Sequence, residues 1–333
     1  MRILGYKDID RAEWSRLVAS SATGTWFQTP EAYDFYASQP ELFQPFAFGV
    51  TNDEKLRGVC VGYVTVEKST VKQMLTRRAI IVGGSALADD CTDEEVVELM
   101  SAVRRQLQAQ AIYVETRNYN DYSRWKDAFV KAGFEYVPHL NFHVDTSSME
   151  IADANLGKSR KRDIRTTIRE GVTIIEHPTD EQVCEYYKVL DNLYRTKVKT
   201  PLFPLSFFLA LSKHKDGRLL LMEYQGRIIG GTVCVEQANK CVYEWFVCGE
   251  DGVYPHVFPS SYATYAGIKY ASEHGCARFD MMGAGTPDEE YGVRDFKARF
   301  GGELVEHGRF LCVTKPLLYK IGVLGVKILK KIK

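Results

Sequence analysis

The sequence predicts a mixed α/β protein, with mixed sheets, whose architecture is built twice along the chain. Strand-like and helix-like segments alternate, and they follow the same order in each half. Matching segments recur at an offset of about 165–175 residues, as Val59-Cys60-Val61 and Val233-Cys234-Val235 illustrate. Similar elements can recur by chance in any α/β protein, but the near-constant offset favours an internal duplication.

Composition narrows the class of protein. The 333 residues suit two domains of ordinary size, and the 45% of hydrophobic residues can fill two cores. Lys+Arg and Asp+Glu are equal at 43 each, so only local patches can attract nucleic acid or membrane. The eight cysteines are scattered without a CxxC pair, and the seven histidines show no metal spacing. We therefore expect a protein of a reducing, cytoplasmic compartment without a disulfide framework or metal site.

The first half predicts two helices, a hairpin, two further strand–helix pairs and a final strand. The segment from Thr92 to Gln110 has a threonine cap, an acidic first turn and arginines toward its end, as helices prefer. Pro30 suits the first turn of another helix. The predicted helices are 8–20, 30–36, 92–110 and 122–131, and the predicted strands are 46–50, 58–66, 79–82, 112–115 and 134–137.

The second half repeats this order. Its predicted helices are 179–197, 260–274 and 294–300, and its predicted strands are 218–223, 228–236, 240–248, 278–281 and one from 303 onward. The stretch 278–303 combines a strand, a glycine-bearing loop and a short basic-aromatic helix that ends at Gly301-Gly302. We expect a first domain over 1–150, a second over 151–314 and a tail over 315–333.

Three stretches carry a resemblance to a known family: WFQTPEAYDFY (26–36), the basic helix KSRKRDIRTTIREGV (158–172) and DFKARFGG (295–302). The element order resembles the GNAT N-acyltransferase fold, present twice. The whole chain is similar to the Fem family of aminoacyltransferases, which build peptidoglycan cross-bridges, and it resembles the members without a coiled-coil arm. The resemblance implies transfer of an amino acid from aminoacyl-tRNA, a co-substrate, to an amine of a cell-wall or cell-envelope precursor, without a cofactor.

The resemblance also implies two catalytic residues. Lys297 matches the family's lysine near the acyl-transfer centre, where an ammonium would stabilise the oxyanion or hold the donor's terminal phosphate. Glu115 falls where the family carries an acidic residue that orients or deprotonates the acceptor amine. Each has a structural alternative. Lys297 would be a helix-face lysine paired with Asp295 or Glu303, and Glu115 a strand-end carboxylate paired with Arg117.

Further residues are predicted to bind substrate: Gln28, Tyr36, Arg117, Arg162, Arg165, Tyr262, Arg294 and Phe296. Gln28 lies in the entry turn that lines the acceptor side in the family. Tyr36 stands where family members often have a lysine that contacts the precursor, which argues against a nucleotide-linked acceptor. Phe296 is expected either to line the donor channel or to lie in the core.

The basic helix and the tail are candidate surfaces for anionic partners. Arg162, Arg165 and Arg169 share a helix face that would bind phosphates of tRNA or of a diphosphate precursor, or would be merely solvated. The tail, with six lysines, no acids and an apolar stripe, would lie on the inner membrane surface or dock on the core.

Two alternatives to aminoacyl transfer follow from the donor site. GNAT enzymes bind the CoA pyrophosphate on a glycine-rich turn that opens a helix. The loop 254–261 has two prolines and lacks the needed glycines, which disfavours CoA there, whereas Gly83-Gly84 leaves CoA open in the first half. The alternatives are an acyl-CoA enzyme that modifies an amino sugar or lipid-linked glycan, and a non-catalytic envelope-assembly protein.

Overall fold

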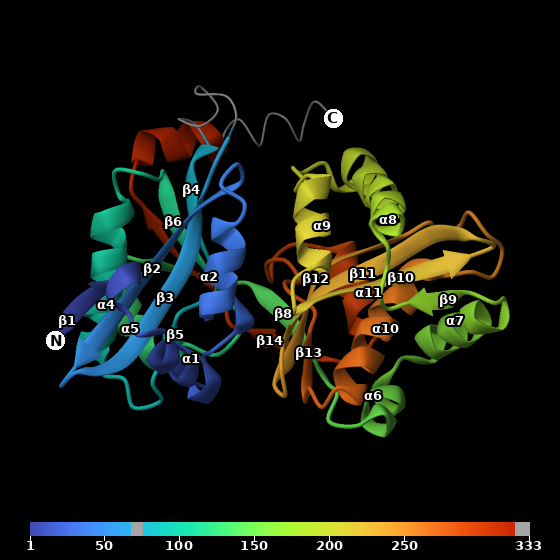
Figure 1. Ribbon diagram of the computed structural model, residues 1–333, viewed down its shortest axis with the longest axis horizontal. Coiled ribbons are helices and arrows are strands. Elements are labelled where there is room, and N and C mark those ends of the chain that lie inside the picture. The colour runs from blue at the N-terminus through green and yellow to red at the C-terminus, as the bar shows by residue number, and fades with distance from the viewer. Residues whose placement is uncertain (68–75, 324–333) are drawn as a thin grey trace. The chain divides into compact units, whose positions relative to one another are not determined.

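The computed structural model describes residues 1–67 and 76–323, and the chain divides into two compact units (Figure 1). One unit comprises Met1–His139 together with the chain from Glu306 onward, and the other comprises Leu140–Val305. The division differs from the predicted boundaries after residues 150 and 314. The reason is strand pairing, because residues 140–145 join the second sheet and the chain after β14 returns to the first.

The first unit contains a mixed sheet with the strand order β1-β2-β3-β4-β6-β15-β7, in which the short β5 pairs with β3. Its strands are β1 (Arg2–Gly5), β2 (Phe43–Asn52), β3 (Lys55–Thr65), β4 (Arg78–Gly83), β5 (Ala86–Leu87), β6 (Tyr113–Asn118), β7 (Glu135–Val137) and β15 (Arg309–Val313). Only the pairing of β4 with β6 is parallel among the pairings described for this sheet.

Helices cover both faces of this first sheet (Figure 1). α1 (Arg11–Ser20) and α2 (Pro30–Ala37) lie on one face, and α4 (Asp93–Leu107) and α5 (Lys126–Lys131) on the other. The core under α4 and α5 includes Val103 and the stacked rings of Phe129 and Phe310, whose centroids are 4.0 Å apart. A smaller cluster packs Trp14 and Leu17 of α1 against β3. The apolar sides of these helices are therefore buried.

The second unit contains a sheet with the order β14-β8-β13-β12-β11-β10-β9. Its strands are β8 (Leu140–Asp145), β9 (Thr173–Ile175), β10 (Gly217–Tyr224), β11 (Arg227–Gln237), β12 (Cys241–Gly249), β13 (Arg278–Asp280) and β14 (Glu303–Glu306). Its helices are α6 (Met149–Asn155), α7 (Lys158–Arg169), α8 (Asp180–Leu193), α9 (Leu205–Ser212), α10 (Pro259–Glu273) and α11 (Gly292–Ala298). A π-helical turn over Tyr194–Val198 extends α8.

The two sheets are equivalent strand by strand, which agrees with the predicted duplication. β3 and β11 hold equivalent places in the two sheets. β6 and β13 do as well, because β6 pairs in parallel with β4 and β13 pairs in parallel with β12. Each sheet also takes a strand from the other half of the chain. β8 follows β7 but pairs with β13, and β15 follows β14 but pairs with β6. The mixed α/β fold class is confirmed, and the exchange of strands is a feature that the sequence did not predict.

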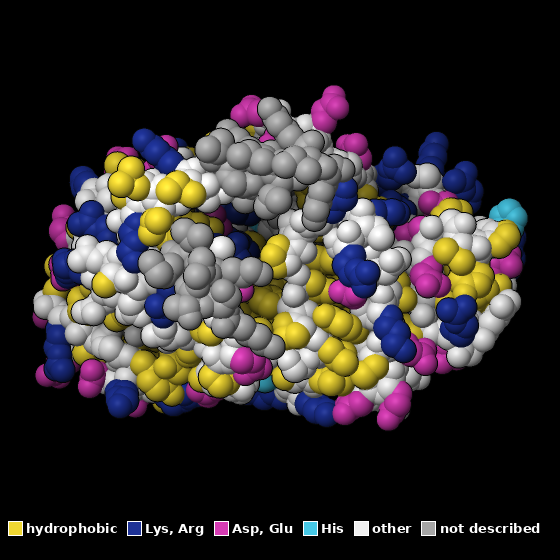
Figure 2. All heavy atoms as spheres, turned by 90° about the horizontal axis from the view of Figure 1, so that it is seen from above, with side chains coloured by type: hydrophobic (Ala, Val, Ile, Leu, Met, Phe, Trp, Pro, Cys, Tyr) yellow, Lys and Arg dark blue, Asp and Glu magenta, His cyan; other side chains and the backbone are white. Residues whose placement is uncertain are grey.

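The surface carries charges of both signs. Figure 2 shows Lys and Arg side chains interspersed with Asp and Glu over the visible face, as their equal numbers lead one to expect. The start of the predicted tail lies against the first unit. The rings of Tyr319 and Tyr113 make an edge-on contact there, with their centroids 5.5 Å apart. Leu317 and Ile321 of the same segment are exposed. The rest of the tail, residues 324–333, lies outside the described residues, so its predicted membrane contact stays a prediction.

Candidate functional site

Lys297 is a buried lysine of α11 in the second unit, and its ammonium lies within the loop that precedes this helix. Its side chain is 6% exposed, and its ammonium donates hydrogen bonds to the carbonyl oxygens of Met281, Met282 (3.2 Å) and Gly283 (2.7 Å). An ammonium has three N–H donors, so all of them are used. The structural alternative of an exposed lysine paired with Asp295 or Glu303 is therefore wrong.

Arg294, one turn earlier on α11, continues the same pattern. Its guanidinium donates to the carbonyl oxygens of Ala284 (2.9 Å), Thr286 and Glu289 (3.0 Å). The left-handed φ angles of Met282, Gly283 and Gly285, between 49° and 79°, fold the loop tightly here. Two cations of α11 thus hold the loop between β13 and α11 in one conformation. We name this loop with its two cations the α11 clamp.

Carboxylates surround the ammonium of Lys297. Burial lowers the pKa of Lys297, and the negative charges of Glu244 and Asp280 act in the opposite direction. Asp280 itself holds the loop from the other side, since its Oδ1 accepts a hydrogen bond from the N–H of Met282 at 2.9 Å. Glu244 and Asp280 therefore favour the charged form of Lys297, although burial remains the larger effect.

Glu244 of β12 is a residue that the sequence reasoning missed. It is 3% exposed, and burial raises its pKa to about 6. The hydroxyl of Thr232 donates to its Oε1 at 3.2 Å, but its Oε2 has no hydrogen-bond partner among the described residues. The hydroxyl of Thr264 on α10 lies beside this carboxylate and acts to lower its pKa. A charged residue inside the apolar run of 240–248 was the available signal.

Glu115 of β6 is paired with two arginines. Its Oε1 accepts hydrogen bonds from Nε of Arg117 at 2.7 Å and from a terminal nitrogen of Arg309 at 3.3 Å. Burial raises the pKa of Glu115, but Arg117 and Arg309 outweigh burial and hold the pKa below its usual range. The pairing with Arg117 is confirmed, but Glu115 lies within β6 and not at the end of a strand, because β6 continues to Asn118. A carboxylate with a lowered pKa is a weak proton acceptor, so its predicted catalytic role gains no support here.

Gln28 and Tyr36 are both buried in the first unit. The amide of Gln28 donates to the carbonyl oxygens of Val61 and Val82, both at 2.9 Å, and accepts from the N–H of Val61 at 2.7 Å. It thereby joins β3 to β4 where these strands diverge. These hydrogen bonds account for the burial of the Gln28 amide without a bound ligand. The ring centroids of Tyr36 and Tyr63 lie 4.9 Å apart. The hydroxyl of Tyr36 has no hydrogen-bond partner among the described residues.

The basic helix α7 divides into an exposed and a buried side. Arg162, Arg165 and Arg169 are exposed on one face, as predicted. Arg160 is 4% exposed and donates to the hydroxyl of Ser261 and to the carbonyl oxygen of Phe296. The spacing of Arg160 with buried Ile164 and Thr167 on one helix face was the signal for this burial.

Phe296 and Tyr262 belong to the packing of the second unit. The guanidinium of Arg160 lies 4.6 Å from the ring centroid of Phe296, a cation–π contact. Tyr262 of α10 is 8% exposed within the core, against which Phe296 also packs. The structure thus brings Lys297, Arg294 and Phe296 together on α11 and places Glu115 and Arg117 together on β6. The roles of these residues in binding stay predictions.

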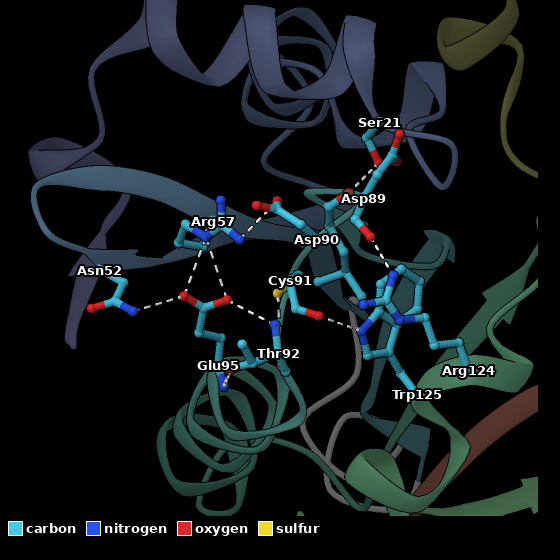
Figure 3. Close-up of polar contacts among 11 residues, drawn as sticks. Ser21, Asn52, Arg57, Asp89, Asp90, Cys91, Thr92, Glu95, Arg124 and Trp125 are labelled. Carbon is cyan, nitrogen blue, oxygen red and sulfur yellow. Dashed lines mark hydrogen bonds and ion pairs between the residues drawn. The ribbon is translucent and has the colours of Figure 1, made fainter.

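The N-terminus of α4 is occupied by the protein's own carboxylates (Figure 3). Glu95 accepts hydrogen bonds from the N–H of Thr92 at 2.9 Å, from Asn52 at 3.1 Å and from Arg57 at 3.2 Å. Asp90 pairs with the same arginine at 2.8 Å. This acidic cap disfavours an anion there, although helix N-termini ordinarily attract anions.

Gly83 and Gly84, just before β5, have a packing explanation. Both have positive φ angles, of 80° and 78°. A Cβ atom at Gly83 would lie 2.2 Å from the Thr25 hydroxyl, and one at Gly84 would lie 2.3 Å from the Tyr122 hydroxyl. These side chains fill the space that a phosphate cradle would need. The glycines therefore do not indicate a pyrophosphate site.

The equivalent helix of the second unit, α10, begins at Pro259 without a capping hydrogen bond from the side chain of Phe258. Instead, Oδ1 of Asp251 accepts a hydrogen bond from the N–H of Ser260 at 3.3 Å. A proline without an N–H and a neighbouring carboxylate leave a poor site for a pyrophosphate. The lack of a CoA turn in this half stays a prediction.

The described residues contain no group of three or more His, Cys, Asp and Glu side chains suited to holding a metal ion. Among the helices of residues 1–67 and 76–323, none has the length and hydropathy needed to cross a membrane. A cavity of about 340 Å³ in the second unit is lined by residues that include His143, Arg278 and Glu303. None of the predicted site residues lines it.

Comparisons with known proteins place this geometry in context. Residues 220–325, which contain the α11 clamp, match the model described as the FemAB family. The fold is similar to the crystal structure of FemX, with a TM-score of 0.72 and 14% identity over 96% of this chain and 99% of that one. No curated protein matches the chain in sequence.

Two further solved structures share the fold. One is the C-terminal domain of a putative lysylphosphatidylglycerol synthetase from Agrobacterium fabrum, with a TM-score of 0.58, 13% identity, and coverage of 96% of this chain and 95% of that one. The other is a tandem GNAT protein from the clavulanic acid biosynthesis pathway, with a TM-score of 0.57, 8% identity, and coverage of 94% and 98%. The tandem GNAT-like fold is thus confirmed, and the FemAB match over residues 220–325 confirms the resemblance to the Fem family.

Proposed function

We propose that the protein is an N-acyltransferase of the Fem type, which transfers an aminoacyl group from aminoacyl-tRNA to an amine of a cell-envelope precursor. The observation that carries this proposal is the match of residues 220–325 to the FemAB family, because this segment contains the α11 clamp with Lys297. The similarity to FemX over most of both chains supports the same fold and no finer property.

The helix N-termini of the two units bear on the identity of the donor. The start of α4 is filled by Glu95 and Asp90, and the start of α10 has Pro259 and the carboxylate of Asp251. Neither offers the free N–H groups on which a CoA pyrophosphate would rest. The exposed arginines of α7 offer a surface for the phosphates of a nucleic acid. Both observations favour aminoacyl-tRNA over acyl-CoA as the donor.

The chemistry needs no covalent intermediate on the protein. The acceptor amine attacks the ester carbonyl of the donor, a C–N bond forms, the ester C–O bond breaks, and the amine proton ends on the leaving hydroxyl. The oxyanion that develops is stabilised by positive charge nearby. Lys297 would act on the oxyanion through its charge and not as a hydrogen-bond donor, because its three N–H groups already bond to carbonyl oxygens. The clamp would keep that charge in place.

Transfer from a labelled pool of aminoacyl-tRNAs to isolated envelope precursors tests the proposal, with acetyl-CoA as the competing donor. We expect the label to pass to a precursor, and we expect excess CoA to leave the rate unchanged. The proposal fails if no aminoacyl-tRNA serves as donor while acetyl-CoA does. Because the acceptor fraction contains both soluble and lipid-linked precursors, its fractionation also reports where the acceptor is located.

A further inference from the structure

The chain forms a short helix on the first unit soon after β15 ends, and we name its residues 316–323 the tail helix. Pro316 occupies the first turn, where proline is favoured. The N–H groups of Thr314 and Lys315 both donate to the carbonyl oxygen of Ile112 at 3.0 Å. Figure 1 shows the tail helix in red at one end of the first unit. Backbone hydrogen bonds therefore fix the place where the tail helix begins.

One side of the tail helix contacts the first unit. Leu318, Tyr319 and Gly322 are half-buried, and their spacing places them on one helix face. The rings of Tyr319 and Tyr113 make the edge-on contact described above. The tail helix is thus docked through this face, and its orientation on the unit is defined.

The other side of the tail helix exposes aliphatic side chains. Leu317 is 78% exposed and Ile321 is 58% exposed, and they lie one turn apart. Lys320, between them in sequence, is exposed as well. Surface helices ordinarily turn their apolar side toward the core. Here Leu317 and Ile321 point away from the unit on which the helix is docked.

The sequence continues this pattern after the tail helix. Aliphatic residues recur at steps of three and four, and lysines recur at steps of seven and four. The aliphatic residues are Leu317, Ile321, Leu324 and Ile328, and the lysines are Lys320, Lys327 and Lys331. Residues 315–333 contain six lysines and no acid, and their longest uncharged run, 321–326, is too short to span a bilayer. This pattern is typical of segments that lie on a membrane surface.

The charge and the side-chain types of this segment favour lipid over protein as its partner. A second copy of the chain would bring six further lysines to the same place, and like charges repel. Energetically important protein contacts are enriched in Trp, Tyr and Arg, and Leu is under-represented among them. An anionic membrane surface suits aliphatic side chains beside lysines, because its hydrocarbon takes up the former and its headgroups attract the latter.

We propose that the tail, residues 315–333, binds a membrane surface that contains anionic lipid. Leu317 and Ile321 enter the boundary between headgroups and hydrocarbon, and the lysines contact the headgroups. Since Tyr319 docks the tail helix on the first unit, this binding holds the folded unit itself at the membrane. The inference goes beyond the proposed function, because it depends on neither the donor nor the acceptor.

Cosedimentation of the full chain with lipid vesicles tests the inference. We expect binding to vesicles of phosphatidylcholine mixed with phosphatidylglycerol, and binding about tenfold weaker or less to phosphatidylcholine alone. Binding to the mixed vesicles should weaken as the salt concentration rises. Absence of binding to the mixed vesicles, or equal binding to both kinds, overturns the inference.

A double variant tests the exposed aliphatic side chains. Leu317→Gln with Ile321→Gln is expected to weaken binding to mixed vesicles about tenfold or more, because two apolar side chains no longer leave water. Glutamine keeps the helix propensity close to that of leucine. Val130→Gln with Lys131→Gln is the matched control, because it removes an exposed aliphatic residue and an exposed lysine of α5. The control should bind as the wild type does.

A triple variant tests the charge. Lys320→Gln with Lys327→Gln and Lys331→Gln is expected to weaken binding about tenfold or more and to make its salt dependence shallower. Gly322→Ala has the opposite sign. A Cβ atom at Gly322 would meet no other atom within 4 Å, so alanine fits and favours the helix. It should strengthen binding up to about fivefold.

Unchanged binding in both the aliphatic and the lysine variants overturns the inference, because another surface would then hold the vesicles. Sedimentation velocity tests the competing occupant. A dimer that Leu317→Gln with Ile321→Gln dissociates, with vesicle binding unchanged, would show that a second copy covers these side chains and would also overturn it. Circular dichroism identifies any variant that fails to fold. These experiments contain no tRNA and no acceptor, so a failure here leaves the proposed aminoacyl transfer untouched, and a failure of transfer leaves this inference untouched.

Discussion

The equivalent strands β6 and β13 place a carboxylate at the same position of the two sheets, with opposite surroundings. Glu115 pairs with two arginines whose side chains are 35% and 27% exposed. Asp280 is fully buried, accepts from Asn141 at 2.8 Å and lies 3.1 Å from Nε2 of His143. The first site keeps excess positive charge within reach of a solute, and the second is consumed by internal contacts. The two equivalent positions thus differ in exposure, because the partners of Glu115 are partly exposed and Asp280 is enclosed.

Asp280 and Lys297 hold the loop between β13 and α11 of the second unit from two sides. Asp280 fixes the N–H side of the loop after β13, and Lys297 fixes its carbonyl side. Buried charges of this kind are stable only when every partner is present. The comparison therefore predicts that changes in the second unit affect stability more than changes at equivalent positions of the first.

The largest effect is expected for Lys297→Met, which leaves three inward carbonyl oxygens and two carboxylates without their cation. We expect a loss of about 3–5 kcal/mol in the free energy of unfolding, measured by urea denaturation. Lys269→Met is the control, because Lys269 forms an exposed pair with Glu273 on α10. Its expected effect is within about 0.5 kcal/mol. Equal midpoints for the two variants would show that the clamp does not stabilise the unit.

The next effect separates the two equivalent carboxylates. Asp280→Asn removes the charge that faces His143 and Lys297, and we expect a loss of about 2–3 kcal/mol. Glu115→Gln acts on partly exposed arginines and should cost about 1 kcal/mol. Urea denaturation of both variants measures the difference. A larger loss in Glu115→Gln than in Asp280→Asn would reverse the comparison.

A pH effect is expected from Glu244, whose pKa is raised from 4.5 to about 6 in the folded protein. The folded state binds this proton more tightly than the unfolded state, so the stabilising contribution is complete below pH 4.5 and is lost as pH rises through about 6. Relative to Glu244→Gln, the wild type should lose on the order of 1–2 kcal/mol over this window. Parallel pH profiles for the two proteins would refute the raised pKa.

The smallest effect on stability is expected for the double variant Arg162→Gln with Arg165→Gln. Arg162 is 75% exposed on its side chain, and Arg165 is also exposed, so the free energy of unfolding should change by less than about 0.5 kcal/mol. Binding of tRNA should weaken and its dependence on salt should become shallower. Undiminished tRNA binding at several salt concentrations would assign α7 a merely solvated face.

Local patterns in the sequence predicted the helices and central strands well. The capping box of Thr92 and Glu95 begins α4 where the sequence indicates, and α10 lies within one residue of its predicted bounds. α9 was missed because its apolar run LSFFLALS lacks a polar face, and β8 because its neighbours in the sheet are distant in sequence. Local signals determine elements, whereas the exchange of β8 and β15 depends on long-range pairing.

The candidate site was predictable in composition but not in contacts. The stretch DFKARFGG identified Lys297, but the sequence could not show that loop carbonyl oxygens would surround the ammonium. The sequence predicted Glu115 as a carboxylate paired with Arg117, although it placed Glu115 at the end of its strand. Arg309 was missed because it stands on a strand almost two hundred positions later, paired with β6 only in the folded sheet.

The role of Glu115 gives the most direct test of the difference between the two units. Aminoacyl transfer by Glu115→Gln should be measured over a range of acceptor concentrations. If Glu115 is only the ion-pair partner of Arg117 and Arg309, kcat should stay within a few-fold of wild type. A fall in kcat of about 10²–10⁴-fold would show that Glu115 accepts the amine proton and would contradict this account.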